Sequence, residues 1–174
     1  MASILDQLLK GDLRTIGNSN AVVKKVLKEP SLFKELFPCL FSKDPGMRMR
    51  SADALEKISL EKPELLQPYK KLLLGKVSMI NQQEVQWHLA QMFSYLELTP
   101  SEEKKVVQIL FQFLDTTNSS IVRVFSIQTL ADIAERNNGL SKKILKRIKD
   151  EVRVGSPAVV TRGKKALGQL KIYG

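Results

Sequence analysis

Apolar residues recur along the chain in four gapless twelve-residue segments. The segments are 47–58, 85–96, 122–133 and 159–170, so their starts are 38, 37 and 37 residues apart. Residues at i, i+8 and i+11 lie on one stripe of an α-helix, so the pattern predicts four amphipathic helices in a regular repeat. The three apolar columns read Met47, Val85, Val122 and Val159; Leu55, Phe93, Leu130 and Leu167; and Ile58, Leu96, Ile133 and Leu170.

A further amphipathic stretch precedes each of these helices, at 31–41, 63–74, 101–114 and 140–152. Asp44-Pro45 and Ser156-Pro157 each place an N-cap acceptor before a proline at the first helical position. Thr99 and Glu102 have the spacing of a capping box, and the Asn-Asn-Gly run at 137–139 is typical of a helix stop. Because no sustained period-2 alternation is found, we expect no β-sheet.

Two helices per repeat, stacked in series, form an α-solenoid. The run at 43–48 followed by 51–55 resembles the HEAT repeat, in which Asp-x-x-Val-Arg leads into Ala-Ala-x-Ala-Leu on the second helix. The resemblance covers about residues 30–172; Arg48 and Arg123 retain the arginine of the repeat, and Gln86 and Val160 replace it. It implies an all-α fold, a right-handed α-α superhelix of the HEAT/armadillo-like type with about five helix pairs.

We therefore expect one HEAT-like repeat domain over residues 1–174. Its repeats are predicted at 30–60, 61–98, 99–136 and 137–174, after a degenerate N-terminal capping unit at 1–29 with helices at 3–10 and 19–28. Ala52 and Ala90 are small where neighbouring helices approach closely. Lys164 occupies the same column in the last repeat, so it marks a terminal repeat whose far side faces water.

The composition offers little for catalysis. With one cysteine (Cys39) and one histidine (His88), a four-ligand Cys/His zinc site is impossible. Cys39 is expected to be an ordinary buried thiol. Because it belongs to a different helix and repeat from His88, we expect no Cys–His dyad. No phosphate-binding glycine-rich loop is present. We expect no cofactor, no metal and no enzymatic activity.

One enzymatic alternative follows from the fold resemblance alone. HEAT-like DNA glycosylases hold duplex DNA on the concave face of such a solenoid, with aromatic residues and an aspartate at the lesion. Trp87 is the single tryptophan here, and the residue one turn later is Gln91 and not a carboxylate. The resemblance to these enzymes therefore stops at the fold.

The start of the sequence and its apolar runs bear on localisation. Residues 1–6 lack the basic and apolar regions of a secretory signal, and the longest apolar runs, such as 72–74, are only a few residues long. A membrane span needs about 20 apolar residues. We expect a cytoplasmic protein without a membrane span.

The second helices supply a candidate binding strip, because such helices line the concave surface of a solenoid. Positions three, four, seven and eleven of each twelve-residue segment lie on the side of the helix away from the apolar stripe. In the alternative interpretation, Trp87 and Phe125 pack against a neighbouring repeat and His88 has a structural or surface role. The candidate residues are Arg50, Trp87, His88, Gln91, Tyr95, Phe125, Gln128, Arg162 and Lys165. Aromatic and arginine side chains dominate the energetics of many interfaces.

The net charge of +10 is concentrated at one end of the chain. Residues 1–135 hold 17 Lys+Arg against 16 Asp+Glu, whereas residues 136–174 hold 11 against 2. Such a block attracts phosphate backbones or an acidic protein surface, although a lysine-solvated capping repeat has the same composition. The candidate basic patch comprises Lys142, Lys143, Lys146, Arg147, Lys149, Arg153 and Lys164.

The sequence thus predicts a non-enzymatic HEAT-repeat binding or scaffold module. Its concave surface would meet a macromolecular partner, most simply a protein or peptide, and its basic C-terminal repeat would add electrostatic attraction. The alternative is a nucleic-acid-binding protein related to the HEAT-like DNA glycosylases. The oligomeric state is left open.

Overall fold

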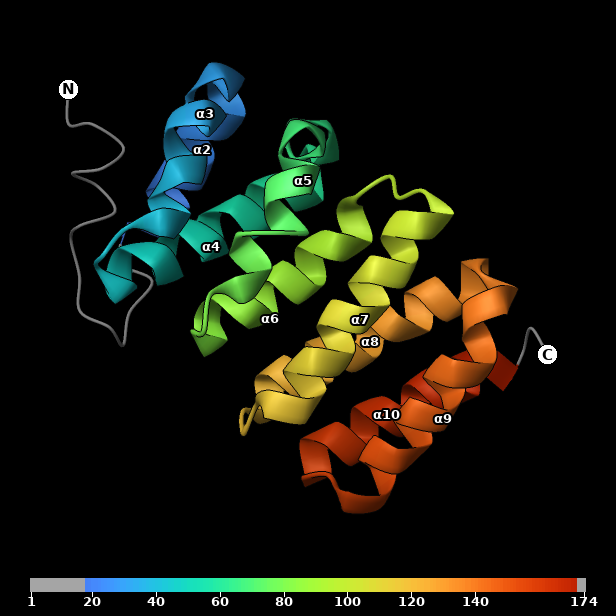
Figure 1. Cartoon of the computed structure of the whole chain (residues 1–174). Helices are drawn as coiled ribbons and strands as arrows, with labels where there is room; N and C mark the ends of the chain where they lie inside the picture. The colour runs from blue at the N-terminus through green and yellow to red at the C-terminus, as the bar shows by residue number, and fades with distance from the viewer. Residues whose placement is uncertain (1–17, 172–174) are drawn as a thin grey trace. The chain divides into compact units, whose positions relative to one another are not determined.

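Every regular element of the computed structural model, which describes residues 18–171, is helical (Figure 1). The α-helices are α2 (Ser19–Lys28), α3 (Phe33–Leu36), α4 (Pro45–Glu61), α5 (Lys70–Leu73), α6 (Gln83–Met92), α7 (Pro100–Thr116), α8 (Ser120–Arg136), α9 (Asn138–Val154) and α10 (Pro157–Lys171). Short 3₁₀ helices are η1 (Pro30–Leu32), η2 (Phe37–Phe41), η3 (Pro63–Leu65), η4 (Gln67–Tyr69), η5 (Val77–Met79) and η6 (Phe93–Tyr95). The predicted all-α class is confirmed, with no strand between residues 18 and 171.

The predicted helix starts are formed. The Asp44 side chain caps α4 by accepting from the Gly46 amide at 2.8 Å. Thr99 and Glu102 form the capping box of α7: the Thr99 amide donates to Glu102 Oε2 at 2.8 Å and the Glu102 amide donates to Thr99 Oγ1 at 3.3 Å. Helix α8 ends at Arg136, before the predicted stop, and α9 begins directly after Asn137.

The first helices of the first two predicted repeats are not continuous. The stretch 31–41 consists of η1, α3 and η2, and the stretch 63–74 consists of η3, η4 and α5. Pro38 and Pro68 lie inside these stretches. Proline lacks the amide hydrogen and clashes with the preceding turn, so each stretch divides into short α and 3₁₀ pieces.

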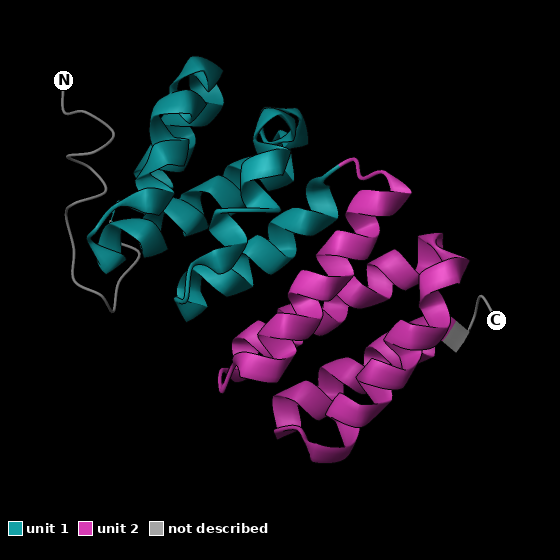
Figure 2. Cartoon of the chain, in the orientation of Figure 1, with its two compact units in different colours: residues 1–96 teal, residues 97–174 magenta. Residues whose placement is uncertain are grey.

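The chain divides into two compact units, residues 1–96 and 97–174 (Figure 2). In unit 1, α4 packs against both α2 and α6. In unit 2, α8 packs against α7, α9 and α10, and α9 packs against α10. The division falls close to the predicted repeat boundary at 98/99, and the single repeat domain stays a prediction. Helix α2 matches the predicted helix at 19–28, while the one predicted at 3–10 lies outside the described residues.

The three apolar columns form the core. All of their side chains are buried except that of Leu167, which is half-buried on α10. Ala52 and Ala90 are fully buried, and Lys164 in the same column is exposed. The repeat pattern in the sequence therefore corresponds to the faces that the second helices bury.

Close contact between α9 and α10 depends on a glycine. A Cβ atom built on Gly163 of α10 would overlap with Cγ2 of Val152 on α9. Gly168, further along the same helix, has no atom within 4 Å of such a Cβ position. The two glycines therefore permit a controlled comparison, because they lie in the same helix and only Gly163 is close to a neighbouring side chain.

We predict that Gly163→Ala destabilises the protein by about 1–3 kcal/mol, because the new methyl group forces α9 and α10 apart. Gly168→Ala is expected to stabilise it by up to about 1 kcal/mol, because alanine favours helix and meets open space. Urea unfolding of both variants measures the two free energies. Equal changes in the two variants would contradict the tight α9–α10 contact.

Candidate binding surface

Helix α9 has an apolar face and a lysine face. Ile144 and Ile148 are fully buried on the inner face. Lys142, Lys146 and Lys149 follow at spacings of four and three residues, so they lie on one stripe of the helix, and all three are exposed. The amphipathic pattern of the sequence therefore orients these lysines away from the core.

The arginines of the same region hold the helices together. Arg123 Nη1 on α8 lies 2.5 Å from Glu151 Oε2 on α9, and Glu151 Oε1 lies 3.0 Å from Arg147 Nη2. Arg147 Nη1 also pairs with Asp115 Oδ1 of α7 at 2.7 Å. Glu151 is buried, so these charge-assisted contacts satisfy a carboxylate that burial would otherwise destabilise.

Two further acidic side chains of unit 2 also form ion pairs with arginines. Arg136 Nε donates to Glu103 Oε1 at 2.7 Å, and Asn137 Nδ2 donates to Glu103 Oε2 at 2.6 Å. Arg153 pairs with Asp150. These carboxylates therefore neutralise arginine, and the lysines of α9 make no ion pair with an acidic residue in 18–171.

The predicted basic patch divides into paired and unpaired residues. Arg147 and Arg153 are ion-paired, and Lys143 Nζ lies over the Phe111 ring, 5.3 Å from its centroid. The remaining lysines are exposed and make no ion pair with any residue in 18–171. We call these the unpaired lysines: Lys142, Lys146, Lys149 and Lys164, together with Lys165 from the predicted strip.

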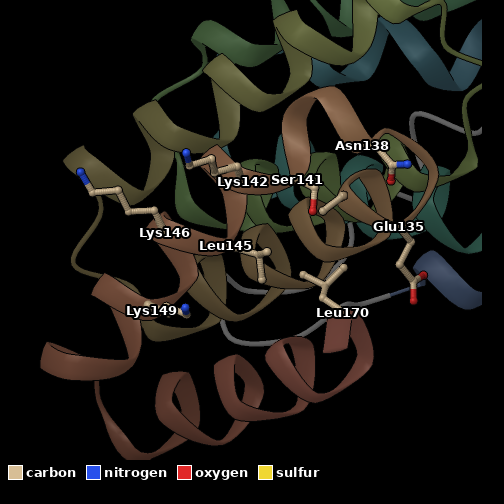
Figure 3. Close-up of a pocket in the computed structure, with 9 residues that line it drawn as sticks. Glu135, Asn138, Ser141, Lys142, Leu145, Lys146, Lys149 and Leu170 are labelled. Carbon is tan, nitrogen blue, oxygen red and sulfur yellow. The ribbon is translucent and has the colours of Figure 1, made fainter. Parts of the chain in front are cut away.

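Three of the unpaired lysines border a cleft of about 650 Å³ at the end of α8 and between α9 and α10, here named the α9 cleft. Its lining is Ala134, Glu135, Asn138, Ser141, Lys142, Leu145, Lys146, Lys149 and Leu170. In Figure 3, Leu145 and Leu170 lie between the lysines of α9 and Glu135. The cleft thus combines an apolar centre with a basic side.

A smaller cleft of about 430 Å³, the α8–α10 cleft, lies between the second helices of unit 2. Its lining is Val124, Pro157, Ala158, Thr161, Arg162 and Lys165. Arg162 Nη1 donates to Gln128 Oε1 at 2.8 Å, and Gln128 Nε2 donates to Asp132 Oδ1 at 2.8 Å. The structure therefore brings together three residues of the predicted strip, Gln128, Arg162 and Lys165.

The predicted exposure of Arg50 and His88 is wrong, because both are buried. The Arg50 side chain is 2% exposed; it lies against the first turn of α4, where its guanidinium is 4.0 Å from Asp44 and a Cβ on Gly46 would be 3.0 Å from Nη2. Side chains on a helix lean toward its N-terminus, and the long Arg50 side chain extends in this direction along α4. Its guanidinium is therefore buried and does not contribute to the strip. Arg50 and His88 are therefore removed from the candidate binding residues.

His88 belongs to a buried polar cluster that links α2, α4 and α6. Its Nε2 lies 4.0 Å from Asp53 Oδ1, and Asp53 Oδ2 accepts from Ser19 Oγ at 2.5 Å and from Lys57 Nζ at 2.8 Å. The His88 Nδ1 atom is buried without a hydrogen-bond partner in the described structure. Burial agrees with the structural alternative for this histidine.

The other strip residues of unit 1, together with Phe125, are half-buried. The Trp87 ring contacts the His88 ring edge-on, with 4.9 Å between centroids. Tyr95 donates to Glu56 Oε1 at 2.6 Å, and burial raises the pKa of both groups. Gln91 contacts the Trp87 carbonyl at 3.4 Å. The aromatic residues of this strip thus contribute to packing as well as to the surface.

Sequence reasoning did not identify Glu135, Leu145 and Leu170 as cleft residues. The amphipathic pattern of residues 140–152 places Leu145 on the apolar face of that helix, and the repeat pattern places Leu170 in the third apolar column. Both assignments agree with their burial, since Leu170 is buried and Leu145 half-buried. The missing signal is the packing of α8, α9 and α10 around this edge, because contacts between helices are not contained in the pattern of a single helix.

Among residues 18–171, no group of three or more His, Cys, Asp or Glu side chains is arranged to hold a metal ion. Cys39 is buried on η2, where its Sγ contacts the Glu35 carbonyl at 3.5 Å and burial raises the thiol pKa. Over the same residues, no helix has the length and hydrophobicity required to cross a bilayer.

Comparison of the chain with models of known protein families, with curated proteins and with solved structures finds no match. The resemblance to the HEAT repeat therefore depends on the repeat residues of the chain itself.

The buried His88 predicts a pH dependence of stability. Burial lowers its pKa from 6.5 to about 4, against an opposing contribution from Asp53. The unfolded chain therefore binds more protons than the folded protein between these values, and stability is lost as the pH falls. We predict that, from pH 6.5 to about 4.5, the wild type loses about 2 kcal/mol more unfolding free energy than His88→Gln.

Urea unfolding of both proteins at the two pH values measures this difference. Subtracting the change in the His88→Gln variant removes the pH-dependent contributions that the two proteins share. Parallel losses of stability in the two proteins would contradict a buried, neutral His88.

Proposed function

We propose that the chain is a non-enzymatic HEAT-like repeat protein that binds an acidic macromolecular partner through its last helix pair. The observation that carries this proposal is the separation of charges in unit 2. Arg123, Arg136, Arg147 and Arg153 are each paired with a carboxylate, whereas the unpaired lysines remain exposed on α9 and α10. A set of unpaired cations attracts an anionic partner at little cost to the fold.

The arginines that the HEAT resemblance singles out support the repeat assignment. Arg48 Nη1 donates to the Ser42 carbonyl at 2.7 Å, and Arg123 Nη2 donates to the Thr117 carbonyl at 3.0 Å. Each arginine therefore bonds the carbonyl six residues before it, in the connection between the two helices of its pair. Equivalent residues have equivalent contacts in units 1 and 2, as expected of repeats in a right-handed α-α superhelix.

The concave surface expected of the second helices is a narrower part of this proposal. After removal of Arg50 and His88, its candidate residues are Trp87, Gln91, Tyr95, Phe125, Gln128, Arg162 and Lys165. In unit 2 this surface contains the α8–α10 cleft. Arg162 and Lys165 in that cleft favour the alternative partner, a nucleic acid, because their cations could contact phosphates without reading sequence.

We predict that the triple variant Lys142→Gln, Lys146→Gln, Lys149→Gln binds fluorescein-labelled polyglutamate about tenfold or more weakly than the wild type. Wild-type binding should weaken between roughly 50 and 200 mM salt, because the contacts are charged and exposed. Fluorescence anisotropy measures both effects. The melting temperature should be unchanged, since these lysines have no partners to lose.

The matched control is Lys104→Gln with Lys105→Gln, which removes exposed charges from α7 and should have a smaller effect. Absence of wild-type binding at the low salt concentration, or undiminished binding by the triple variant, would refute the proposal. Tighter binding to a DNA duplex, abolished in a mobility shift by Arg162→Ala with Lys165→Ala, would replace it with the nucleic-acid function.

A further inference from the structure

The α9 cleft has two chemically different parts. Its apolar lining is formed by Ala134, Leu145 and Leu170, and one side is formed by lysines of α9 (Figure 3). A phosphate backbone needs cations but gains nothing from leucines, whereas an amphipathic protein segment uses both. The composition of the cleft therefore favours a protein segment.

The volume of the cleft sets the size of its occupant. About 650 Å³ is within the range of sites that hold a small ligand, roughly 300–1,000 Å³. Such a space accepts a few side chains from one segment and excludes the body of a nucleic-acid duplex. The stems of Lys142, Lys146 and Lys149 can lie along apolar partner atoms while their ammonium groups stay in water.

The spacing of the lysines specifies the partner further. Along α9, Lys142 and Lys146 are separated by a rise of about 6 Å, and Lys146 and Lys149 by about 4.5 Å. A helix antiparallel to α9 with glutamates at i, i+3 and i+7 presents three carboxylates at the same intervals. Leucines at i+4 and i+11 lie on the neighbouring stripe of that helix, as Leu145 neighbours the lysine stripe on α9.

Glu135 places a negative charge on one side of the α9 cleft. It lies on the opposite side from Lys146 and Lys149, with Leu145 and Leu170 between them (Figure 3). No ion pair connects Glu135 to a lysine in the described part of the chain. A carboxylate of the partner placed beside Glu135 would be repelled, so the preferred partner carries its carboxylates on the side that faces the lysines.

We propose that the α9 cleft binds an acidic amphipathic helix of a partner protein, with its carboxylates on Lys142, Lys146 and Lys149 and its apolar side chains on Leu145 and Leu170. This inference rests on the proposed function and names the class of partner. The lysines select by charge and the leucines by apolar burial, so both parts of the partner are needed.

A synthetic peptide tests the assignment. The probe is a labelled, alanine-based helical peptide of about 18 residues with glutamates at i, i+3 and i+7 and leucines at i+4 and i+11. We expect Lys146→Glu to weaken its binding about tenfold or more, and Glu135→Gln to tighten it about threefold. Replacing both peptide leucines with serine should weaken binding at least about tenfold.

The control variant Lys104→Glu makes the same charge change on α7 and should alter peptide binding less than Lys146→Glu. Circular dichroism melts check that each variant is folded. Equal effects of Lys104→Glu and Lys146→Glu, with equal binding of the leucine and serine peptides, would overturn the cleft assignment while polyglutamate binding left the proposed function standing. Loss of binding to every acidic probe would refute both.

Two other occupants give distinct results. If a DNA duplex bound in competition with the peptide, more tightly than it and with the same sensitivity to Lys146→Glu, the cleft would be a nucleic-acid site. If sedimentation revealed a dimer that Lys146→Glu dissociates, the cleft would be an interface between copies of this chain. Either result overturns the peptide proposal.

Discussion

The burial of one apolar stripe on each second helix is the constraint on which the remaining features depend. Residues at i, i+8 and i+11 of the four segments 47–58, 85–96, 122–133 and 159–170 are buried, except for the half-buried Leu167. Helix α4 packs against both α2 and α6. Ala52 and Ala90 are fully buried and permit this close approach, whereas Lys164, in the same column of α10, is exposed. The residue type in this column therefore follows its burial.

Arginine and lysine have different tasks in unit 2. The planar guanidinium of Arg147 contacts Asp115 and Glu151 together, and Glu151 is also held by Arg123. A planar fork of donors suits such multiple contacts, while the flexible, strongly hydrated lysine ammonium suits an exposed surface. A sum of charges over the sequence counts the two residue types equally, but four arginines of unit 2 are paired with carboxylates, whereas the unpaired lysines are exposed.

Local signals in the sequence were sufficient for α4, α8 and α10 and for the caps of α4 and α7. The helix predicted over 85–96 instead ends at Met92 and is followed by the 3₁₀ helix η6. Asp44 with Pro45 and Thr99 with Glu102 interact within a few residues, so their geometry follows from their spacing. Pro38 and Pro68, at which the first helices are divided, are also visible in the sequence. The amphipathic pattern of each stretch does not show this division. The positions of Arg50 and His88 depend on contacts with Asp44 and Asp53 and with packed neighbouring helices, which a helical projection does not contain.

We distinguish arginines that stabilise the fold from lysines that are available to a partner. The most direct test is the thermal unfolding of two variants with substitutions at adjacent residues of α9. Arg147→Gln and Lys146→Gln each remove one positive charge from the same helix, and the helix propensities of the three residue types are similar. Arg147→Gln should lower the melting temperature by at least about 4 °C, because it weakens the contacts of the buried Glu151. Lys146→Gln should leave it within about 1 °C of the wild type. Equal melting temperatures for the two variants, or a larger loss for Lys146→Gln, would contradict this division.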